Sequence, residues 1–337
     1  MRLTRRKILQ SGLVLGLGMN LSGLAQGQDD APMDLELDGN IRRVHDPAII
    51  KEGDTYYLFS TGAGIPVRHS TDLVNWRLSF PPRVFPRIPD WAREMIPNQN
   101  DFWAPDISYF NDKFHLYYSV STFGSNRSVI GLATNVTLDP QSDDFEWVDQ
   151  GLVIESVRSD DYNCIDPNVI LDEDGVPWLA FGSHWSGIKM RRLDYETGKL
   201  SSEDETLYSL ASRRIHPRAI EAPFIIRKGD FYYLFVSFDA CCQGANSTYN
   251  VRVGRSESVT GHYVDRDGVD MMNDGGTQVT FPTERWRGPG HNSVLQENGV
   301  DYLVYHAYDA DNQGVFTLRI DPIVWDADGW PEMITPD

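Results

Sequence analysis

Apolar and polar positions alternate in short runs along this chain, and five stretches repeat one arrangement of them. Each stretch has a short apolar run, a turn rich in Gly, Asp or Asn, and an aromatic-rich run, which is typical of a β-hairpin. A third apolar run follows each hairpin, and Trp76, Trp147 and Trp330 mark a further segment in three repeats. The hairpins are HDPAIIKEGDTYYLFS, APDISYFNDKFHLYYS, DPNVILDEDGVPWLAFGS, EAPFIIRKGDFYYLFVS and HNSVLQENGVDYLVYH.

The spacing of the repeats predicts how they are arranged. Anchored on Pro47, Pro105, Pro167, Pro223 and Ser293, successive repeats are 58, 62, 56 and 70 residues apart. Five units of four strands, without helical periodicity of useful length, predict an all-β fold: a five-bladed β-propeller with four-stranded antiparallel blades. A β-sandwich is the alternative, but it gives no reason for the first strand to recur with an Asp-Pro or Ala-Pro opening.

Three acidic residues occupy nearly the same place in their repeats: Asp46, Asp166 and Glu221. Equivalent positions of a propeller converge on its axis, so we expect the three carboxyl groups in one pocket. An inverting glycosidase needs one protonated carboxyl for the leaving oxygen and one carboxylate to activate water, roughly 6.5–9.5 Å apart. A third carboxylate beside the acid helps to keep it protonated through like-charge repulsion.

Aromatic residues make up 12% of the chain, and Trp103, Phe123 and Trp185 fall close to the predicted axis. Sugar rings present apolar C–H faces that stack on such side chains, so acids combined with aromatic residues favour a carbohydrate pocket.

The net charge of −19 argues against nucleic acid and anionic membrane surfaces as partners. Three cysteines exclude a disulfide framework and zinc spacing, but leave open whether the adjacent Cys241 and Cys242 are bonded.

The first residues have the features of an export signal. Four cations precede an apolar stretch that ends in small residues: Arg2, Arg5, Arg6 and Lys7. The TRRKILQ context is similar to a twin-arginine signal, although an ordinary secretory signal shares most of its features. We expect a signal peptide at residues 1–27 and a single propeller catalytic domain at residues 28–337. The protein would then be exported, periplasmic or extracellular, and bacterial.

Motifs in every repeat resemble the arabinanases of glycoside hydrolase family 43, over nearly the whole span from His45 to Asp326. The resemblance implies a propeller enzyme that inverts configuration and cleaves α-1,5-L-arabinofuranosidic bonds in arabinan, with little action on xylan. We also expect a monomer, with no nucleic acid as a partner and no membrane after cleavage of the signal. The motifs are HDPAI, FWAPDISY, YYSVSTFGSNRSVIGLATN, YNCIDPN, FGSHWSGIKM, IEAPFI, CCQGANSTYNVRVGRS and GPGHNSV.

The resemblance also assigns roles by position. Asp46 of His-Asp-Pro would be the general base, and Glu221 of Glu-Ala-Pro the general acid. Asp166 of Ile-Asp-Pro would modulate the pKa of the acid and orient it. His291 would hold a single ion, calcium, through its imidazole and a shell of waters. Cys164 departs from the motif, where a small residue such as Ala is expected.

Two further candidates for substrate binding lie in the third-repeat motifs, Asn163 in YNCIDPN and Ser183 in FGSHWSGIKM. His45 and His306 are candidates for the pocket wall. The endo mode of cleavage is expected. An exo-arabinanase, an α-L-arabinofuranosidase or a β-xylosidase of the same family is the alternative, and a non-catalytic sugar-binding propeller would be expected to lose one of the acids.

Overall fold

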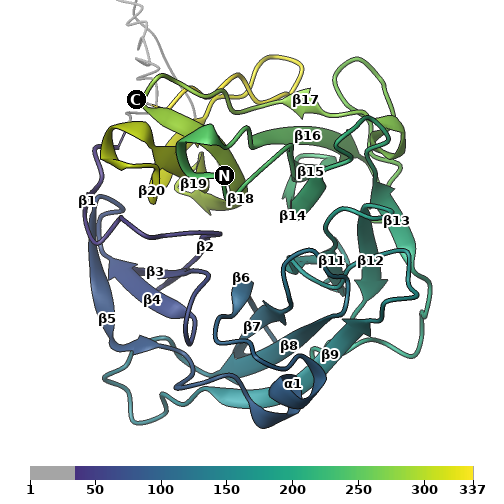
Figure 1. Ribbon diagram of the computed structural model, residues 1–337. Coiled ribbons are helices and arrows are strands. Elements are labelled where there is room, and N and C mark those ends of the chain that lie inside the picture. Colours follow the sequence, from purple (N-terminus) through teal and green to yellow (C-terminus); the bar gives the residue numbers. More distant parts are fainter. Residues whose placement is uncertain (1–34, 337) are drawn as a thin grey trace, which may run out of the picture. The chain divides into compact units, whose positions relative to one another are not determined.

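Five sheets surround a central axis, with β2, β6, β10, β14 and β18 as their innermost strands (Figure 1). The computed structural model describes residues 35–336, so the predicted signal at residues 1–27 lies outside the described residues. The innermost strands of neighbouring sheets contact one another in cyclic order. The five-bladed β-propeller predicted from the repeats is therefore confirmed.

The strands follow the chain from blade to blade. Blade 1 contains β1 (Asp38–Gly39), β2 (Ala48–Glu52), β3 (Thr55–Phe59), β4 (Pro66–Ser70) and β5 (Asn75–Arg83). Blade 2 contains β6 (Trp103–Phe110), β7 (Lys113–Val120), β8 (Ser128–Asn135) and β9 (Val148–Ser156), and blade 3 contains β10 (Asn168–Leu171), β11 (Pro177–Phe181), β12 (Ile188–Arg192) and β13 (Tyr208–Ala211). Blade 4 contains β14 (Ile220–Lys228), β15 (Phe231–Phe238), β16 (Asn250–Ser256) and β17 (Thr277–Gln278), and blade 5 contains β18 (Trp286–Glu297), β19 (Val300–Asp309) and β20 (Val315–Ile323).

Short helices occupy some of the connections. They are α1 (Asp90–Met95), η1 (Gly244–Asn246), η2 (Met271–Asn273) and η3 (Ala310–Asn312). The apolar pattern of the sequence did not indicate α1, which is only six residues long. None of the helices among the described residues has the length and apolar character needed to cross a membrane.

The fifth blade departs from the predicted four strands. Its sheet has three strands among the described residues, and the outer place beside β20 is taken by residues 41–43 from the opposite end of the chain. There the backbone N–H of Leu318 donates to the carbonyl oxygen of Ile41 at 2.9 Å. The Trp330 segment, predicted as the fourth strand, forms a turn instead. The pairing of residues 41–43 with β20 joins the two ends of the described chain within one blade and so closes the ring of blades.

The hydrophobic core is divided among the interfaces between blades. Five buried clusters each combine residues of two neighbouring blades, and together they pass once around the ring. The side chains that fill them include Trp76, Phe102, Tyr305 and Phe235, all at most 1% exposed. Because every blade buries its two faces against its neighbours, a chain of this length needs no single large core.

One residue in the left-handed backbone region opens the innermost part of every blade. These residues are Asp46 (φ 52°), Ala104 (φ 42°), Asp166 (φ 57°), Ala222 (φ 54°) and His291 (φ 49°). Asp46, Asp166 and His291 are therefore structurally equivalent, whereas Glu221 precedes this position by one residue. The anchor predicted at Ser293 is also wrong by one residue, since Asn292 follows His291 as Pro47 follows Asp46.

Hydrogen bonds between blades hold this left-handed conformation, which costs a residue other than glycine roughly 1–2 kcal/mol. In each blade the backbone N–H of the left-handed residue donates to a side chain of the preceding blade. The bonds run from Ala104 to Thr61 (2.8 Å), Asp166 to Ser119 (3.1 Å), Ala222 to Asp166 (3.0 Å), His291 to Ser237 (2.8 Å) and Asp46 to His306 (3.2 Å). This ring positions the residues that face the axis.

Candidate active site

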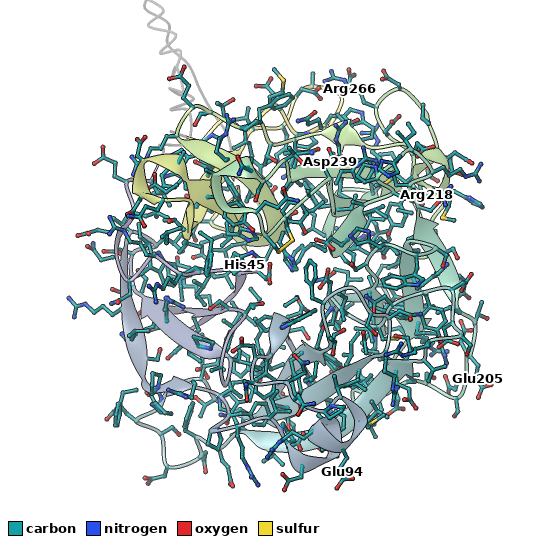
Figure 2. The ribbon with its side chains drawn as sticks, in the orientation of Figure 1. His45, Glu94, Glu205, Arg218, Asp239 and Arg266 are labelled. Atoms are coloured by element: carbon teal, nitrogen blue, oxygen red, sulfur yellow. A yellow bond between two sulfur atoms is a disulfide. The ribbon has the colours of Figure 1, made fainter. Side chains whose placement is uncertain are left out.

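A cavity of about 760 Å³ lies at the axis, and every residue predicted for the site except His306 lines it. These residues are Asp46, Trp103, Phe123, Asn163, Asp166, Ser183, Trp185, Glu221 and His291. His45 also lines the cavity and lies near the centre of the ring of sheets, whereas Glu94 and Glu205 lie at its periphery (Figure 2). The structure thus brings acids of three blades into one cavity.

Asp46 is a buried carboxylate surrounded by donors. Thr61 donates its hydroxyl to Oδ2 at 2.5 Å, and the Nδ1 atoms of His45 and His291 lie 2.7 Å and 3.0 Å from Oδ1. Burial by itself would raise the pKa of Asp46, but the two imidazoles outweigh it and hold the pKa well below its usual range. Asp46 is therefore ionised at neutral pH, as a group that activates water must be.

His306 supports Asp46 from behind the cavity wall. It is fully buried, so the expectation that it lines the pocket is wrong, and its ring stacks on that of His45 at 3.8 Å between centroids. Burial holds its pKa well below the ordinary value, with the His45 charge adding to the effect. The neutral ring accepts the backbone N–H of Asp46 at Nδ1, which leaves the proton on Nε2.

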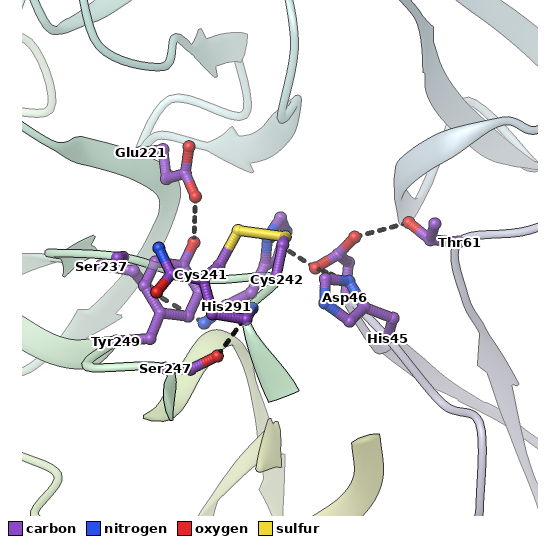
Figure 3. Close-up of a disulfide and its surroundings, with 12 residues drawn as sticks. His45, Asp46, Thr61, Glu221, Ser237, Cys241, Cys242, Ser247, Tyr249 and His291 are labelled. Carbon is purple, nitrogen blue, oxygen red and sulfur yellow. Dashed lines mark hydrogen bonds and ion pairs between the residues drawn. A yellow bond between two sulfur atoms is a disulfide. The ribbon is translucent and has the colours of Figure 1, made fainter. Parts of the chain in front are cut away.

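Glu221 lies across the cavity with a donor at each carboxyl oxygen. Ser183 donates to Oε2 at 2.7 Å. Tyr249 donates to Oε1 at 2.7 Å (Figure 3). His184 Nε2 lies farther away, 3.8 Å from Oε2. Burial raises the pKa of Tyr249 well above its ordinary value, and the neighbouring acids raise it further, so its hydroxyl stays a donor.

Asp166 connects the two sides of the site. Its Oδ2 accepts the backbone N–H of Ala222 at 3.0 Å, which fixes the strand beside Glu221. Burial raises the pKa of Asp166 to about 8, with the charges of Glu221 and Asp46 adding to the rise and His291 opposing it. The cavity therefore retains an acidic proton at neutral pH on the side of Glu221.

A cation would bind His291 at Nε2 by displacing the proton that the ring carries there at neutral pH. Burial would lower the pKa of His291, but Asp46 first and then the other acids raise it to about 9. An imidazole that binds a metal commonly directs its other nitrogen at a carboxylate, as Nδ1 of His291 does here. Calcium prefers six to eight oxygen ligands, so waters would have to complete the shell.

A second set of possible ligands surrounds Asp46. The ligand atoms of His45, Asp46 and His306 lie within 4.8 Å of one another. His306 Nδ1 already accepts the Asp46 N–H and has no lone pair left for a metal. Of the imidazoles around Asp46, His291 is therefore better suited to a cation than His306.

Aromatic side chains form the outer wall of the cavity. Phe123 is 81% exposed and Trp185 is 43% exposed, and Trp103 lies deeper. Ligand pockets are lined mainly by apolar and aromatic side chains, so this group of rings at one cavity suits the binding of a ligand. Asn163 is buried, and its Oδ1 accepts the hydroxyl of Ser128 at 2.6 Å, which orients the amide.

Several site residues were not predicted from the sequence. Thr61 and Tyr249 hold the acids, and Cys241 and Cys242 form a disulfide in the cavity wall. Tyr249 belongs to a motif that carries the family resemblance, CCQGANSTYNVRVGRS, but its role depends on a contact with a strand 28 residues away. No local pattern distinguishes such a tyrosine from one that packs between blades.

The family model for glycosyl hydrolases family 43 matches residues 41–331. The chain belongs to glycoside hydrolase family 43. This membership confirms the family predicted from the motifs, and with it a hydrolase acting on glycosides.

Curated relatives and solved structures agree with the assignment. An extracellular exo-α-(1→5)-L-arabinofuranosidase of Cellvibrio japonicus is 46% identical over 301 residues, which cover 86% of each chain. An extracellular endo-α-(1→5)-L-arabinanase of Bacillus subtilis is 45% identical over 294 residues, covering 86% of this chain and 87% of the relative. An α-L-arabinanase of Cellvibrio cellulosa in complex with arabinohexaose superposes with a TM-score of 0.81 at 45% identity, covering 86% of this chain and 95% of that one.

Proposed function

We propose that this family 43 hydrolase cleaves α-1,5-L-arabinofuranosidic bonds in arabinan with inversion. The observation that carries the proposal is the contrast between two carboxyl groups in one cavity. Asp46 faces two imidazoles, which hold it ionised, whereas Glu221 lies beside Asp166, which retains a proton at neutral pH. Relatives of 45% and 46% identity are named for α-(1→5)-arabinan chemistry. A cavity of about 760 Å³ is within the range of roughly 300–1,000 Å³ typical of ligand sites.

Each carboxyl group has one task in the proposed reaction. Asp46 takes a proton from water as that water attacks the anomeric carbon. Glu221 gives its proton to the glycosidic oxygen as the bond to the anomeric carbon breaks. Tyr249 and Ser183 stabilise the Glu221 carboxylate that results, and Asp166 keeps a proton nearby and orients the strand.

The ion belongs to the same proposal. His291 Nε2 would hold the cation, and waters would complete its shell. The bound cation would add positive charge and ordered waters to a cavity that contains three carboxyl groups. With a single protein ligand it would exchange readily, which separates it from a structural calcium site.

We propose the endo mode of cleavage, with an exo mode as the second candidate, because relatives of both kinds are similarly close to this chain. An endo enzyme releases a range of oligosaccharides in the first minutes, whereas an exo enzyme releases one product size.

Export is proposed from the N-terminal signal pattern, and two relatives named extracellular support it.

The test is a time course on linear α-1,5-arabinan with chromatography of the products. Asp46→Asn and Glu221→Gln should nearly abolish hydrolysis, while Asp54→Asn in the exposed β2–β3 turn should leave it intact. Proton NMR of the earliest product should show the anomer opposite to the substrate linkage. Activity on xylosides without activity on arabinan would reject the substrate, and retention of configuration would reject the role of Asp46.

A further inference from the structure

The Cys241–Cys242 disulfide lies in the wall of the catalytic cavity and has no part in the reaction described above. It belongs to the loop between β15 and β16, and Cys242 is exposed. In Figure 3 the two sulfurs are drawn between the Glu221–Tyr249 pair and Asp46, and all of these residues line the same cavity.

One contact of this loop leads to Asp46. The backbone N–H of Cys242 donates to the hydroxyl oxygen of Tyr308 at 2.8 Å, and that hydroxyl lies 2.9 Å from Nε2 of His45. His45 Nδ1 lies 2.7 Å from Asp46 Oδ1. An ionised carboxylate only accepts, so Nδ1 of His45 carries a proton; in the neutral ring Nε2 then accepts from the Tyr308 hydroxyl, and in the charged ring it donates to that hydroxyl. The Cys242 backbone is thus connected to Asp46 through Tyr308 and His45.

The other end of the same loop leads to Glu221. Tyr249, which donates to Glu221 Oε1, is the last residue before β16. The carbonyl oxygen of Ala240 accepts the backbone N–H groups of Thr248 and Tyr249 at 2.9 Å and 3.1 Å. The two ends of the loop are therefore tied together, and a change at the disulfide reaches both acids through one backbone segment.

We propose that the Cys241–Cys242 disulfide is a positioning element for the reaction and a sugar-contacting wall of the cavity. The bond closes a small covalent ring that includes the peptide between the two residues, so the backbone N–H of Cys242 keeps a fixed direction toward Tyr308. The paired sulfurs also present a compact, polarisable and weakly polar surface without an S–H donor, which suits the C–H face of a sugar ring. The sugar contact rests on the proposed function, because arabinan supplies the ring.

Reduction would undo both effects. A phosphine breaks the S–S bond: phosphorus is oxidised to the phosphine oxide with oxygen from water, and the sulfurs become two thiols that take the two protons of that water. The thiols occupy more of the cavity, and the backbone is released from the ring. Exposed disulfides are the readily reduced ones, and an oxidising compartment outside the cell would keep this one formed.

The experiment compares oxidised wild type, phosphine-reduced wild type and Cys241→Ala/Cys242→Ala on linear arabino-oligosaccharides. We expect reduction or the double substitution to lower kcat/KM about tenfold or more, since misplacement of a catalytic group by about 1 Å costs on the order of 100-fold. Reoxidation should restore the wild type, and the double variant should not respond to phosphine. Cys164→Ala is the matched control: its thiol is buried outside the cavity, and the variant should respond as the wild type does.

Two further measurements separate the parts of the proposal. Binding of an arabino-oligosaccharide to Glu221→Gln, followed calorimetrically, should weaken about tenfold on reduction, because a lost apolar contact changes affinity by that order. In Tyr308→Phe, which interrupts the chain to His45, kcat should fall, and reduction should then act mainly on KM.

Unchanged kcat, KM and oligosaccharide binding after complete reduction of a folded protein would overturn the proposal. If the double variant fails to fold, the reduced wild type decides, provided that its melting temperature shows it folded. A loss of kcat/KM explained entirely by a fallen melting temperature would also overturn it. An oxidised enzyme that does not hydrolyse arabinan at all refutes the proposed function instead, which keeps the two failures distinct.

Discussion

Replacing Tyr249 by Phe tests whether the tyrosine hydroxyl assists the general acid. The hydroxyl donates to Glu221 Oε1 at 2.7 Å, and the ring packs so closely on the backbone of Gly290 that an added Cβ there would lie 2.2 Å from it. Tyr249→Phe keeps the ring and its packing and removes only the donor. The free energy of folding should therefore change little.

The size of the effect follows from where charge develops. As Glu221 gives up its proton in the transition state its carboxylate becomes negative, and the Tyr249 hydroxyl then donates to a charged acceptor. Such hydrogen bonds are worth about 1.5–3 kcal/mol, which corresponds to a loss of roughly 10- to 150-fold in kcat. The loss should appear only where the leaving group needs a proton.

The assay compares arabinan with dinitrophenyl α-L-arabinofuranoside, whose leaving group departs without protonation. Tyr249→Phe should slow the first reaction strongly and the second little, and it should add almost nothing in a Glu221→Gln background. Tyr263→Phe is the control, since this buried hydroxyl donates to the Val259 carbonyl oxygen at 2.8 Å outside the cavity. If Tyr249→Phe lowered kcat equally on both substrates, or lowered it by the full factor in the Glu221→Gln background as well, the reasoning would be refuted.

Three further substitutions test the remaining groups. Burial raises the pKa of Asp166 to about 8, so Asp166→Asn removes a carboxyl that retains a proton in the cavity up to that pH. The alkaline limb of the kcat/KM profile should therefore move to lower pH, and a limb that stays in place would contradict the role of Asp166. His291→Ala should lower kcat/KM on the order of 100-fold with a nearly unchanged melting temperature, and chelation should not unfold the protein; the opposite pattern would indicate a structural site. Thr61→Val removes the donor to Asp46 and the acceptor for the Ala104 N–H, and should cost about tenfold in kcat or more, whereas full activity would show that the other donors suffice.

The blades and the convergence of the acids were predictable because their signals are local and repeated. An apolar run, a tight turn and an aromatic-rich run define each hairpin within about 17 residues of sequence, and this pattern recurs five times. The turn between β18 and β19 illustrates the local code, since Asn298 and Gly299 both have positive φ as a type I′ turn requires. Repetition then places Asp46 and Asp166 at the axis without knowledge of any contact.

The rest depends on contacts between distant segments. Residues 41–43 complete the fifth blade because they reach β20, and nothing in their own pattern distinguishes them from the Trp330 segment. The offset of Glu221 by one residue from the position of Asp46 becomes visible only through backbone angles. Tyr249 and Thr61 act through side chains brought close by the closed ring, so their roles could not be predicted from spacing.

Protonation is the property that the sequence encodes least directly. Asp46 and Asp166 both precede proline, both have a left-handed backbone and both donate their backbone N–H to the preceding blade. Burial raises the pKa of each, yet the pKa of Asp46 is held well below the ordinary value while that of Asp166 rises to about 8. The difference comes from the neighbours: two imidazoles face Asp46, whereas Asp166 lies beside Glu221. Two copies of one dipeptide thus form a carboxylate that is held ionised and a carboxyl that retains a proton, because different blades surround them.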